Sequence, residues 1–312
     1  MSRARAHSPA NAPVRTAPEL AAVGELLKPV TWFAPMWAFA CGVVSSGAPL
    51  FGADARWAYA VGGVLLAGPF VCAASQAVND WFDRHVDAIN EPDRPIPSGR
   101  VPGRWGLYIA IFWSAASLAL AASLGTWAFV AGLVAVALAW AYSAPPFRLK
   151  RDGWLGPAAV GLSYEGVAWF TGAAVMLGAA PSPLVVALAL LYSIGAHGIM
   201  TLNDFKALEG DRRTGLRSLP VTLGPDRAAR VACAVMAAPQ VVVVAMLAAV
   251  GKPGHAGAVA TALLAQIYLM PRLLADPRGR APWYNATGVT LYVLGMMASA
   301  LAARSLALGG AA

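Results

Sequence analysis

The sequence predicts an all-α, polytopic membrane protein with nine transmembrane helices, and three observations support this fold class. The 312-residue chain is 58% hydrophobic. Only 12% of its residues are charged, which is about half the share typical of soluble domains. Its apolar residues form long continuous runs, whereas the strands of a membrane barrel alternate in polarity. We therefore expect a bundle of helices that each span the bilayer with about 20 residues.

The spans are separated by loops that alternate between long and short. The predicted spans are residues 29–47, 58–79, 105–122, 126–142, 156–178, 184–202, 231–250, 256–274 and 285–307. Residues 1–28 are polar and lack the apolar core of a signal peptide. We expect this segment to be a disordered cytoplasmic tail.

The basic residues predict how the chain is oriented in the membrane. With the tail and the long loops on one side, all but three of the 23 Lys and Arg residues lie there; the exceptions are Arg56, Lys252 and Arg304. The positive-inside rule makes that side the cytoplasm, and nine spans then place the C-terminus on the opposite side. This topology accounts for the net charge of +8, so we expect membrane lipid and no nucleic acid as partner.

Two long loops begin with related segments. The first is NDWFDRHVDAINEPDRPIPSG from residue 79, and the second is NDFKALEGDRRTGLRSLPVTLG from residue 203. Each starts with Asn-Asp at the end of an apolar span, continues with acids at helical spacing and reaches Arg-x-x-Pro and a Gly. Matching segments in corresponding places indicate an internal two-fold repeat with a site between the halves.

The acidic residues of the repeat predict a metal site. In the first copy three aspartates fall on one helix face with Asn79 beside them, and in the second Asp204 and Asp211 share a face with Asn203 and Glu209 nearby. Mg²⁺ prefers such hard oxygen ligands and bridges them to phosphates. The predicted ligands are Asn79, Asp80, Asp83, Asp87, Asn203, Asp204 and Asp211, with Asp80, Asp83, Asp204 and Asp211 as the catalytic ones. The alternative is a pair of solvated acidic helix ends.

Basic residues near the acids suit a diphosphate. Arg94 and Arg217 hold equivalent places in the repeat and could make bidentate contacts to it. The segment YSAPPFRLKRDGW at 142–154 presents further bases beside the same surface. The predicted diphosphate-binding residues are Arg94, Arg217, Arg148, Lys150 and Lys206. A purely topogenic role is the alternative for any single one of them.

These motifs resemble the UbiA superfamily of intramembrane prenyltransferases. The resemblance is carried by NDxxDxxxD at 79–87, DRPIPSG at 93–99, YSAPPFRLKRDGW at 142–154 and NDFKALEGDR at 203–212. Within that superfamily, SYEGVAWFTGAAV at 163–175 and YSIGAHGIMTLNDFK at 192–206 are similar to the chlorophyll and bacteriochlorophyll synthase branch. One departure is Ala207, which stands where many relatives carry a further acid.

The resemblance implies that residues 29–312 form one prenyltransferase domain, a nine-helix bundle around a central cavity with a cytoplasmic cap. It also implies Mg²⁺-dependent transfer of a geranylgeranyl or phytyl group from its diphosphate to the propionate of bacteriochlorophyllide or chlorophyllide. The expected location is the cytoplasmic, photosynthetic membrane, and the expected protein partners act in pigment biosynthesis or photosystem assembly. Two alternatives remain: a prenyltransferase for a quinone-precursor ring or haem, and a cation-coupled transporter, which would carry its acids near span centres.

Three polar residues within the spans are candidates for binding the tetrapyrrole. His197 lies two turns before Asp204, so it could ligate the pigment's central metal or donate a hydrogen bond. Glu165 and its neighbour Tyr164 could contact a pigment substituent. The alternatives are a packed histidine, a pair between Glu165 and His197, and an interhelical hydrogen bond of Glu165.

Overall fold

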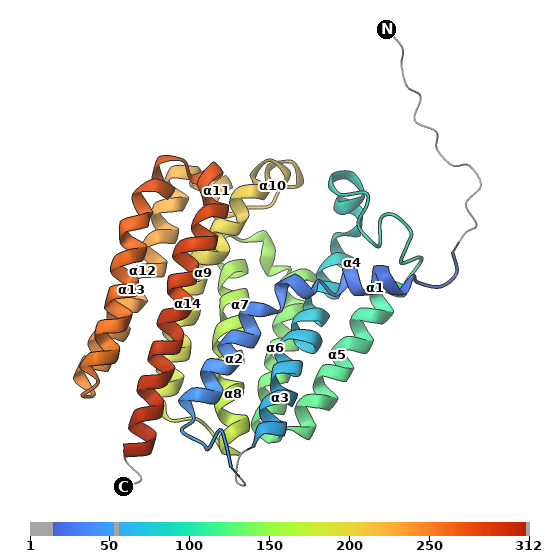
Figure 1. Ribbon diagram of the computed structural model, residues 1–312. Coiled ribbons are helices and arrows are strands. Elements are labelled where there is room, and N and C mark those ends of the chain that lie inside the picture. The colour runs from blue at the N-terminus through green and yellow to red at the C-terminus, as the bar shows by residue number, and fades with distance from the viewer. Residues whose placement is uncertain (1–14, 53–55, 310–312) are drawn as a thin grey trace.

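A computed structural model describes residues 15–52 and 56–309, and they form a bundle of helices (Figure 1). The first half contains α1 (Leu20–Leu26), η1 (Pro29–Thr31), α2 (Phe33–Ser45), α3 (Trp57–Leu65), η2 (Leu66–Cys72), α4 (Ala73–Asn90), α5 (Trp105–Ser123) and α6 (Thr126–Ser143). The second half contains η3 (Leu149–Arg151), α7 (Leu155–Gly161), η4 (Leu162–Val167), α8 (Ala168–Leu177), α9 (Pro183–Asp204), η5 (Phe205–Ala207), α10 (Leu208–Thr214), α11 (Leu219–Thr222), α12 (Pro225–Ala249), α13 (Pro253–Ala275) and α14 (Pro277–Gly309). The described residues contain no β-strand, which confirms the all-α class.

Eight helices of the described chain are long and apolar enough to cross a membrane, and a ninth span results if one bent pair is counted. The pair consists of Leu20–Thr31 and Phe33–Ser45, which meet at 53°. The protein is therefore an integral membrane protein. The predicted first span, 29–47, is wrong as a single helix, because the 3-10 turn η1 and helix α2 are separated by the bend between Thr31 and Phe33.

Residues 20–28 correct the predicted boundary of the disordered tail. They include helix α1, whose buried Ala22 and Leu26 pack with Ala73, Ala77 and Val78 of α4. The segment is docked against the bundle by one small and two large buried apolar residues, Ala22, Leu26 and Leu27. Residues 1–14, which also belong to the predicted tail, lie outside the described residues.

Close helix packing fixes the centre of the bundle. Helices α2 and α8 meet at two glycines, where a Cβ on Gly42 would lie 2.0 Å from the carbonyl oxygen of Trp169. Small residues let helix backbones approach in this way inside membranes. Helix α9 packs against both α7 and α12, and its Tyr192 is fully buried with the hydroxyl 2.9 Å from Ser299 Oγ.

The helices that carry the two acidic motifs point to the same end of the bundle. The end of α4 and the short helix α10 both lie at the upper end in Figure 1, and α14 finishes at the lower end. Both motif helices also extend past the predicted spans, since α4 continues to Asn90 and the helix that begins with α9 continues through η5 and α10 to Thr214. The acids therefore stand on helix ends that project beyond the apolar layer.

Candidate active site

The first acidic motif forms the last three turns of α4, as its spacing predicted. Asp80 and Asp87 are buried, with 2% and 7% of their surface exposed, and Asp83 is half-buried. Lys28 Nζ donates to Asp80 Oδ1 at 2.6 Å, and Arg94 Nη1 donates to Asp87 Oδ2 at 2.9 Å. Arg94 Nη1 also lies 3.5 Å from Asp80. Each buried aspartate of this motif thus has a basic partner.

A second group of bases comes from the loop between α6 and α7. Lys150 Nζ donates to Asp83 Oδ1, and Arg148 Nη2 lies 3.5 Å from the same oxygen. The Lys150 side chain is only 7% exposed. Burial lowers the pKa of Lys150 below its usual value, and the charge of Asp83 opposes that shift. At Arg94 burial acts in the same direction, but Asp87, Asp80 and Glu91 outweigh it and raise the pKa.

The position of this loop depends on its contact with the second motif segment. Arg217 N donates to Arg151 O at 3.0 Å, and Arg217 pairs with Asp152 in an isolated parallel bridge. Gly153 makes this contact close, because a Cβ there would lie 2.6 Å from Leu219 N. The loop that presents Arg148 and Lys150 is therefore held by the segment that follows the second motif.

The second motif is less regular than the first. Asp204 ends α9, and the 3-10 turn η5 separates it from Asp211 in α10. The two acids therefore do not lie on one continuous α-helix, which the prediction of a shared face assumed. Asp211 is buried and accepts a hydrogen bond from Ser218 Oγ at 2.7 Å. Asn203 Oδ1 accepts from Asn285 Nδ2 at 2.8 Å. Glu209 is exposed and pairs with Arg213.

Each motif contributes one residue to the wall of a central cavity of about 510 Å³. Asn79 of the first motif and Asn203 of the second both line it. Tyr142 at the end of α6 also lines it. Beyond the cavity, a Cβ on Gly210 would lie 3.8 Å from Asn90 Nδ2, so the tips of the two motif helices approach each other.

The donor set of the first motif fits a hard divalent cation. Asp80 Oδ2 is buried without a hydrogen-bond partner, and the motif offers carboxylate and amide oxygens, which are the ligands that Mg²⁺ prefers. Within residues 15–52 and 56–309, no group of three or more His, Cys, Asp or Glu side chains is gathered closely enough to hold a metal. In this structure the carboxylates are turned to Lys28, Arg94, Arg148 and Lys150 instead.

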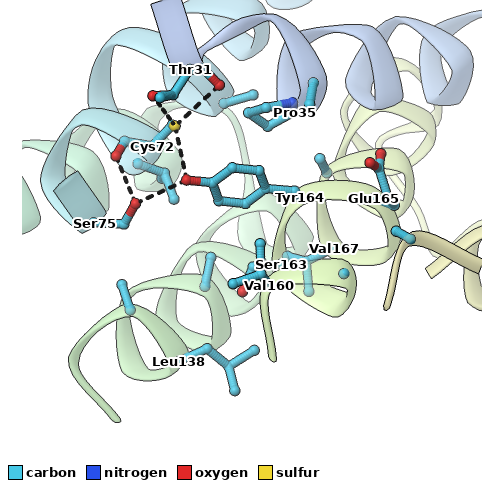
Figure 2. A pocket seen from close by; sticks show the side chains of 18 of the residues that line it. Thr31, Pro35, Cys72, Ser75, Leu138, Val160, Ser163, Tyr164, Glu165 and Val167 are labelled. Atoms are coloured by element: carbon cyan, nitrogen blue, oxygen red, sulfur yellow. Dashed lines mark hydrogen bonds between the residues drawn. The ribbon is translucent and has the colours of Figure 1, made fainter. Parts of the chain in front are cut away.

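The cavity continues from the motifs into the apolar layer. Its wall is mostly apolar, with a polar patch around Tyr164 (Figure 2). Tyr164 Oη accepts from Gln76 Nε2 at 3.0 Å and lies 3.2 Å from Cys72 Sγ. Glu165, which is 7% exposed, also lines the cavity. The predicted pigment residues Tyr164 and Glu165 therefore face the same space as Asn79 and Asn203.

His197 lies elsewhere. It is 93% buried by the packing of α7 on α9, its ring is 5.4 Å from that of Trp154, and it is not among the residues that line the cavity. Both ring nitrogens are buried without a hydrogen-bond partner. Its role in pigment binding stays a prediction, and no contact joins it to Glu165 in the described residues.

The structure changes the set of basic residues near the acids. Arg94, Arg148 and Lys150 contact the first motif, whereas Arg217 and Lys206 are exposed and make no ion pair with either motif in the described chain. Lys28 was missed, because a lysine at the edge of an apolar run also satisfies the positive-inside rule. The signal that could have found it is Pro29, which predicts a bend where Lys28 meets the membrane.

Comparison with known proteins places this architecture in a family. The sequence model of the UbiA prenyltransferase family matches residues 32–294. The chain therefore belongs to that family and is a prenyltransferase. Solved structures have the same fold. One is a UbiA homolog from Archaeoglobus fulgidus bound to DMAPP and Mg²⁺, which superimposes with a TM-score of 0.67 at 22% sequence identity. The superposition covers 93% of this chain and 99% of the homolog.

Among more similar sequences, the bacteriochlorophyll synthase 33 kDa chain of Cereibacter sphaeroides is 59% identical over 292 residues, which cover 94% of this chain and 96% of the relative. The 34 kDa chain of bacteriochlorophyll synthase from Chloroflexus aurantiacus is 46% identical, covering 89% and 88%. Chloroplastic chlorophyll synthase of Arabidopsis thaliana is 36% identical, covering 90% of this chain and 74% of that protein.

Proposed function

We propose that this chain is a bacteriochlorophyll synthase, which transfers a geranylgeranyl or phytyl group from its diphosphate to the propionate carboxylate of bacteriochlorophyllide. The propionate oxygen forms a bond to C1 of the prenyl group, the bond between C1 and the diphosphate oxygen breaks, and the diphosphate leaves. The observation that carries the proposal is the cavity shared by both acidic motifs, together with near full-length identity of 59% to a bacteriochlorophyll synthase chain.

The carboxylates at the head of the cavity would hold Mg²⁺ through Asp80, Asp83, Asp87, Asp204 and Asp211, with Asn79 and Asn203 beside them. When bound, Mg²⁺ would neutralise the negative charge that develops on the leaving diphosphate. The Mg²⁺ and DMAPP in the archaeal homolog support this assignment.

The bases that now pair with the carboxylates would move to the diphosphate oxygens. Lys28, Arg94, Arg148 and Lys150 are the bases in contact with the first motif. Arg94 and Arg148 suit bidentate contacts, and the lysines act as point charges. Arg217 and Lys206 would assist only after the exposed side chains turn inward.

The apolar wall of the cavity would exclude water from the prenyl group while the C1–oxygen bond breaks. The acceptor propionate is ionised at neutral pH, so it can attack without a general base. Tyr164 and Glu165 would contact polar substituents of the pigment. This division places the diphosphate at the motif end and the acceptor ring beside the polar patch.

We further propose that the motif end faces the cytoplasm and that the C-terminus lies on the opposite side of the cytoplasmic membrane. Arg56 precedes α3, Lys252 precedes α13, and Arg304 lies near the end of α14. In Figure 1 these helix ends lie at the end of the bundle away from the motifs. Labelling of single cysteines at position 252 and at position 206 with an impermeant maleimide tests the orientation. Equal labelling from the cytoplasmic side would refute it.

The activity is tested by mass spectrometry of the products from purified protein. The protein receives Mg²⁺, geranylgeranyl or phytyl diphosphate, and either bacteriochlorophyllide or chlorophyllide, with 4-hydroxybenzoate and haem as alternative acceptors. We expect a prenyl ester of bacteriochlorophyllide that disappears when EDTA removes the metal. Prenylation of 4-hydroxybenzoate or haem in place of the pigment would refute the proposed acceptor.

A further inference from the structure

A chain of hydrogen bonds connects the polar patch of the cavity to Lys28. Tyr164 Oη lies 3.2 Å from Cys72 Sγ, and Cys72 Sγ lies 3.4 Å from Thr31 Oγ1 (Figure 2). Thr31 Oγ1 donates to the backbone carbonyl of Lys28 at 2.8 Å. Because that bond uses the only hydroxyl proton of Thr31, the Cys72 thiol must be the donor if it is bonded to Thr31. Cys72 is also the donor in its contact with Tyr164 Oη, so its single thiol proton is directed toward both Thr31 and Tyr164.

The far end of this chain is a bend in the backbone that needs support. Lys28 has φ 47° and ψ 66°, a left-handed conformation that non-glycine residues rarely adopt. The Thr31 backbone N–H and hydroxyl both donate to the Lys28 carbonyl, and Trp32 Nε1 donates to the preceding carbonyl of Leu27 at 2.9 Å. Side chains therefore hold the two carbonyls on either side of the bend.

The three residues of this hydrogen-bond chain lie in segments around the cavity that are not regular α-helix. Thr31 ends η1 at the break between α1 and α2, Cys72 ends the π-helical segment η2, and Tyr164 lies in the π-helical segment η4. Such π-segments are rare and frequently mark functional sites. All three side chains line the cavity, while the Lys28 ammonium at the end of the chain contacts Asp80.

We propose that Tyr164, Cys72 and Thr31 are positioning residues that set the place of Lys28 at the acidic motif. They act through Lys28 and not by touching the diphosphate themselves. The proposal rests on the proposed function only in that a prenyl diphosphate binds at the motif end. It goes further in assigning diphosphate affinity to side chains located inside the cavity.

A double-mutant cycle tests this. The dissociation constant of geranylgeranyl thiodiphosphate, an unreactive analogue, is measured by isothermal titration with Mg²⁺ and without pigment. Thr31→Val keeps the shape of the side chain and removes the hydroxyl, and we expect about fivefold weaker binding, the equivalent of one hydrogen bond. In a Lys28→Met background, the same substitution should change binding by less than about twofold, because the two sites are coupled.

Thr287→Val is the matched control, since Thr287 Oγ1 also donates to a backbone carbonyl, that of Trp283, at 2.9 Å. It should leave the dissociation constant unchanged in both backgrounds. If Thr31→Val lowers the yield of folded protein, as judged by size-exclusion profile and melting temperature, Tyr164→Phe replaces it in the double-mutant cycle with Lys28→Met. Its effect should likewise vanish when Lys28 is replaced.

Equal losses from Thr31→Val in the wild-type and Lys28→Met backgrounds would overturn the proposal, as would no loss in the wild type. These outcomes are separate from failure of the proposed function. Wild-type protein that binds the analogue but forms no pigment ester would refute the acceptor assignment, and the cycle would still decide the role of the three residues. Wild-type protein that does not bind the analogue would refute both.

Discussion

Replacement of Lys28 should shift metal and diphosphate binding in opposite directions. Lys28 Nζ donates to Asp80 Oδ1 in the structure. A metal ion that uses this oxygen must displace the lysine, and one that uses Oδ2 alone is repelled by the nearby ammonium charge. Lys28→Met keeps most of the apolar stem and removes the ammonium group. In the absence of diphosphate it should therefore strengthen Mg²⁺ binding, whereas in the presence of Mg²⁺ it should weaken binding of a prenyl diphosphate.

The size of both effects follows from the contact that is lost. The Lys28 and Asp80 groups are 2.6 Å apart, with side chains 24% and 3% exposed. A hydrogen bond between charged groups contributes about 1.5–3 kcal/mol, and partial exposure of the lysine favours the lower end of that range. A free energy of about 1.4 kcal/mol corresponds to tenfold in affinity. We expect about tenfold tighter Mg²⁺ binding and about tenfold weaker binding of the diphosphate.

Isothermal titration of purified protein with MgCl₂, and then with geranylgeranyl thiodiphosphate at saturating Mg²⁺, measures the two constants. Lys252→Met is the matched control, because Lys252 lies in the turn between α12 and α13, at the end of the bundle away from the motifs, and should change neither constant. Weaker Mg²⁺ binding by Lys28→Met would show that the lysine does not compete for the metal position and would refute this reasoning.

Four further substitutions test other parts of the site. Asp80→Ala and Asp204→Ala should each abolish Mg²⁺-dependent product formation with an unchanged size-exclusion profile; turnover at the wild-type rate by either variant would contradict the metal assignment. Gly153→Ala places a Cβ 2.6 Å from Leu219 N, and such overpacking costs about 1–3 kcal/mol. The Lys150 loop should shift, and titration should show at least about fivefold weaker binding of the thiodiphosphate, the equivalent of about 1 kcal/mol. His197→Ala should lower the melting temperature and leave pigment and diphosphate affinities equal to the wild type, since His197 lies outside the cavity wall; a selective loss of pigment affinity would instead establish the predicted pigment contact.

The sequence was sufficient to predict the spans and the helical form of the first motif. Long apolar runs have few stable arrangements other than membrane helices, and the intervals between Asp80, Asp83 and Asp87 match the period of the helix that α4 forms. These features depend on local sequence, which is why they can be predicted from a single chain. The predicted boundaries were less accurate where a helix continues beyond the apolar layer, as α4 does.

Features that depend on contacts between distant segments could not be predicted in this way. Lys28 and Asp80 are 52 positions apart, and nothing in either local sequence indicates that they meet. The period of a helix also leaves its rotation undetermined. On α9, Ala196 and Asn203 face the cavity, so His197 and Asp204, each one residue later and about 100° round the helix, do not line it. The spacing predicts that His197 and Asp204 share a face, and the role of His197 in pigment binding stays a prediction.

The arrangement of charges explains how a membrane protein can keep several carboxylates together before substrate binds. Neighbouring carboxylates repel one another, and burial of Asp80 and Asp87 adds a desolvation cost. Lys28, Arg94 and Lys150 offset both terms in this structure by pairing with the acids. A diphosphate that binds alone is repelled by the carboxylates, and Mg²⁺ that binds alone is repelled by the basic side chains. Bound together, they match both sets of charges at once, and we infer that the two ligands should bind with positive cooperativity.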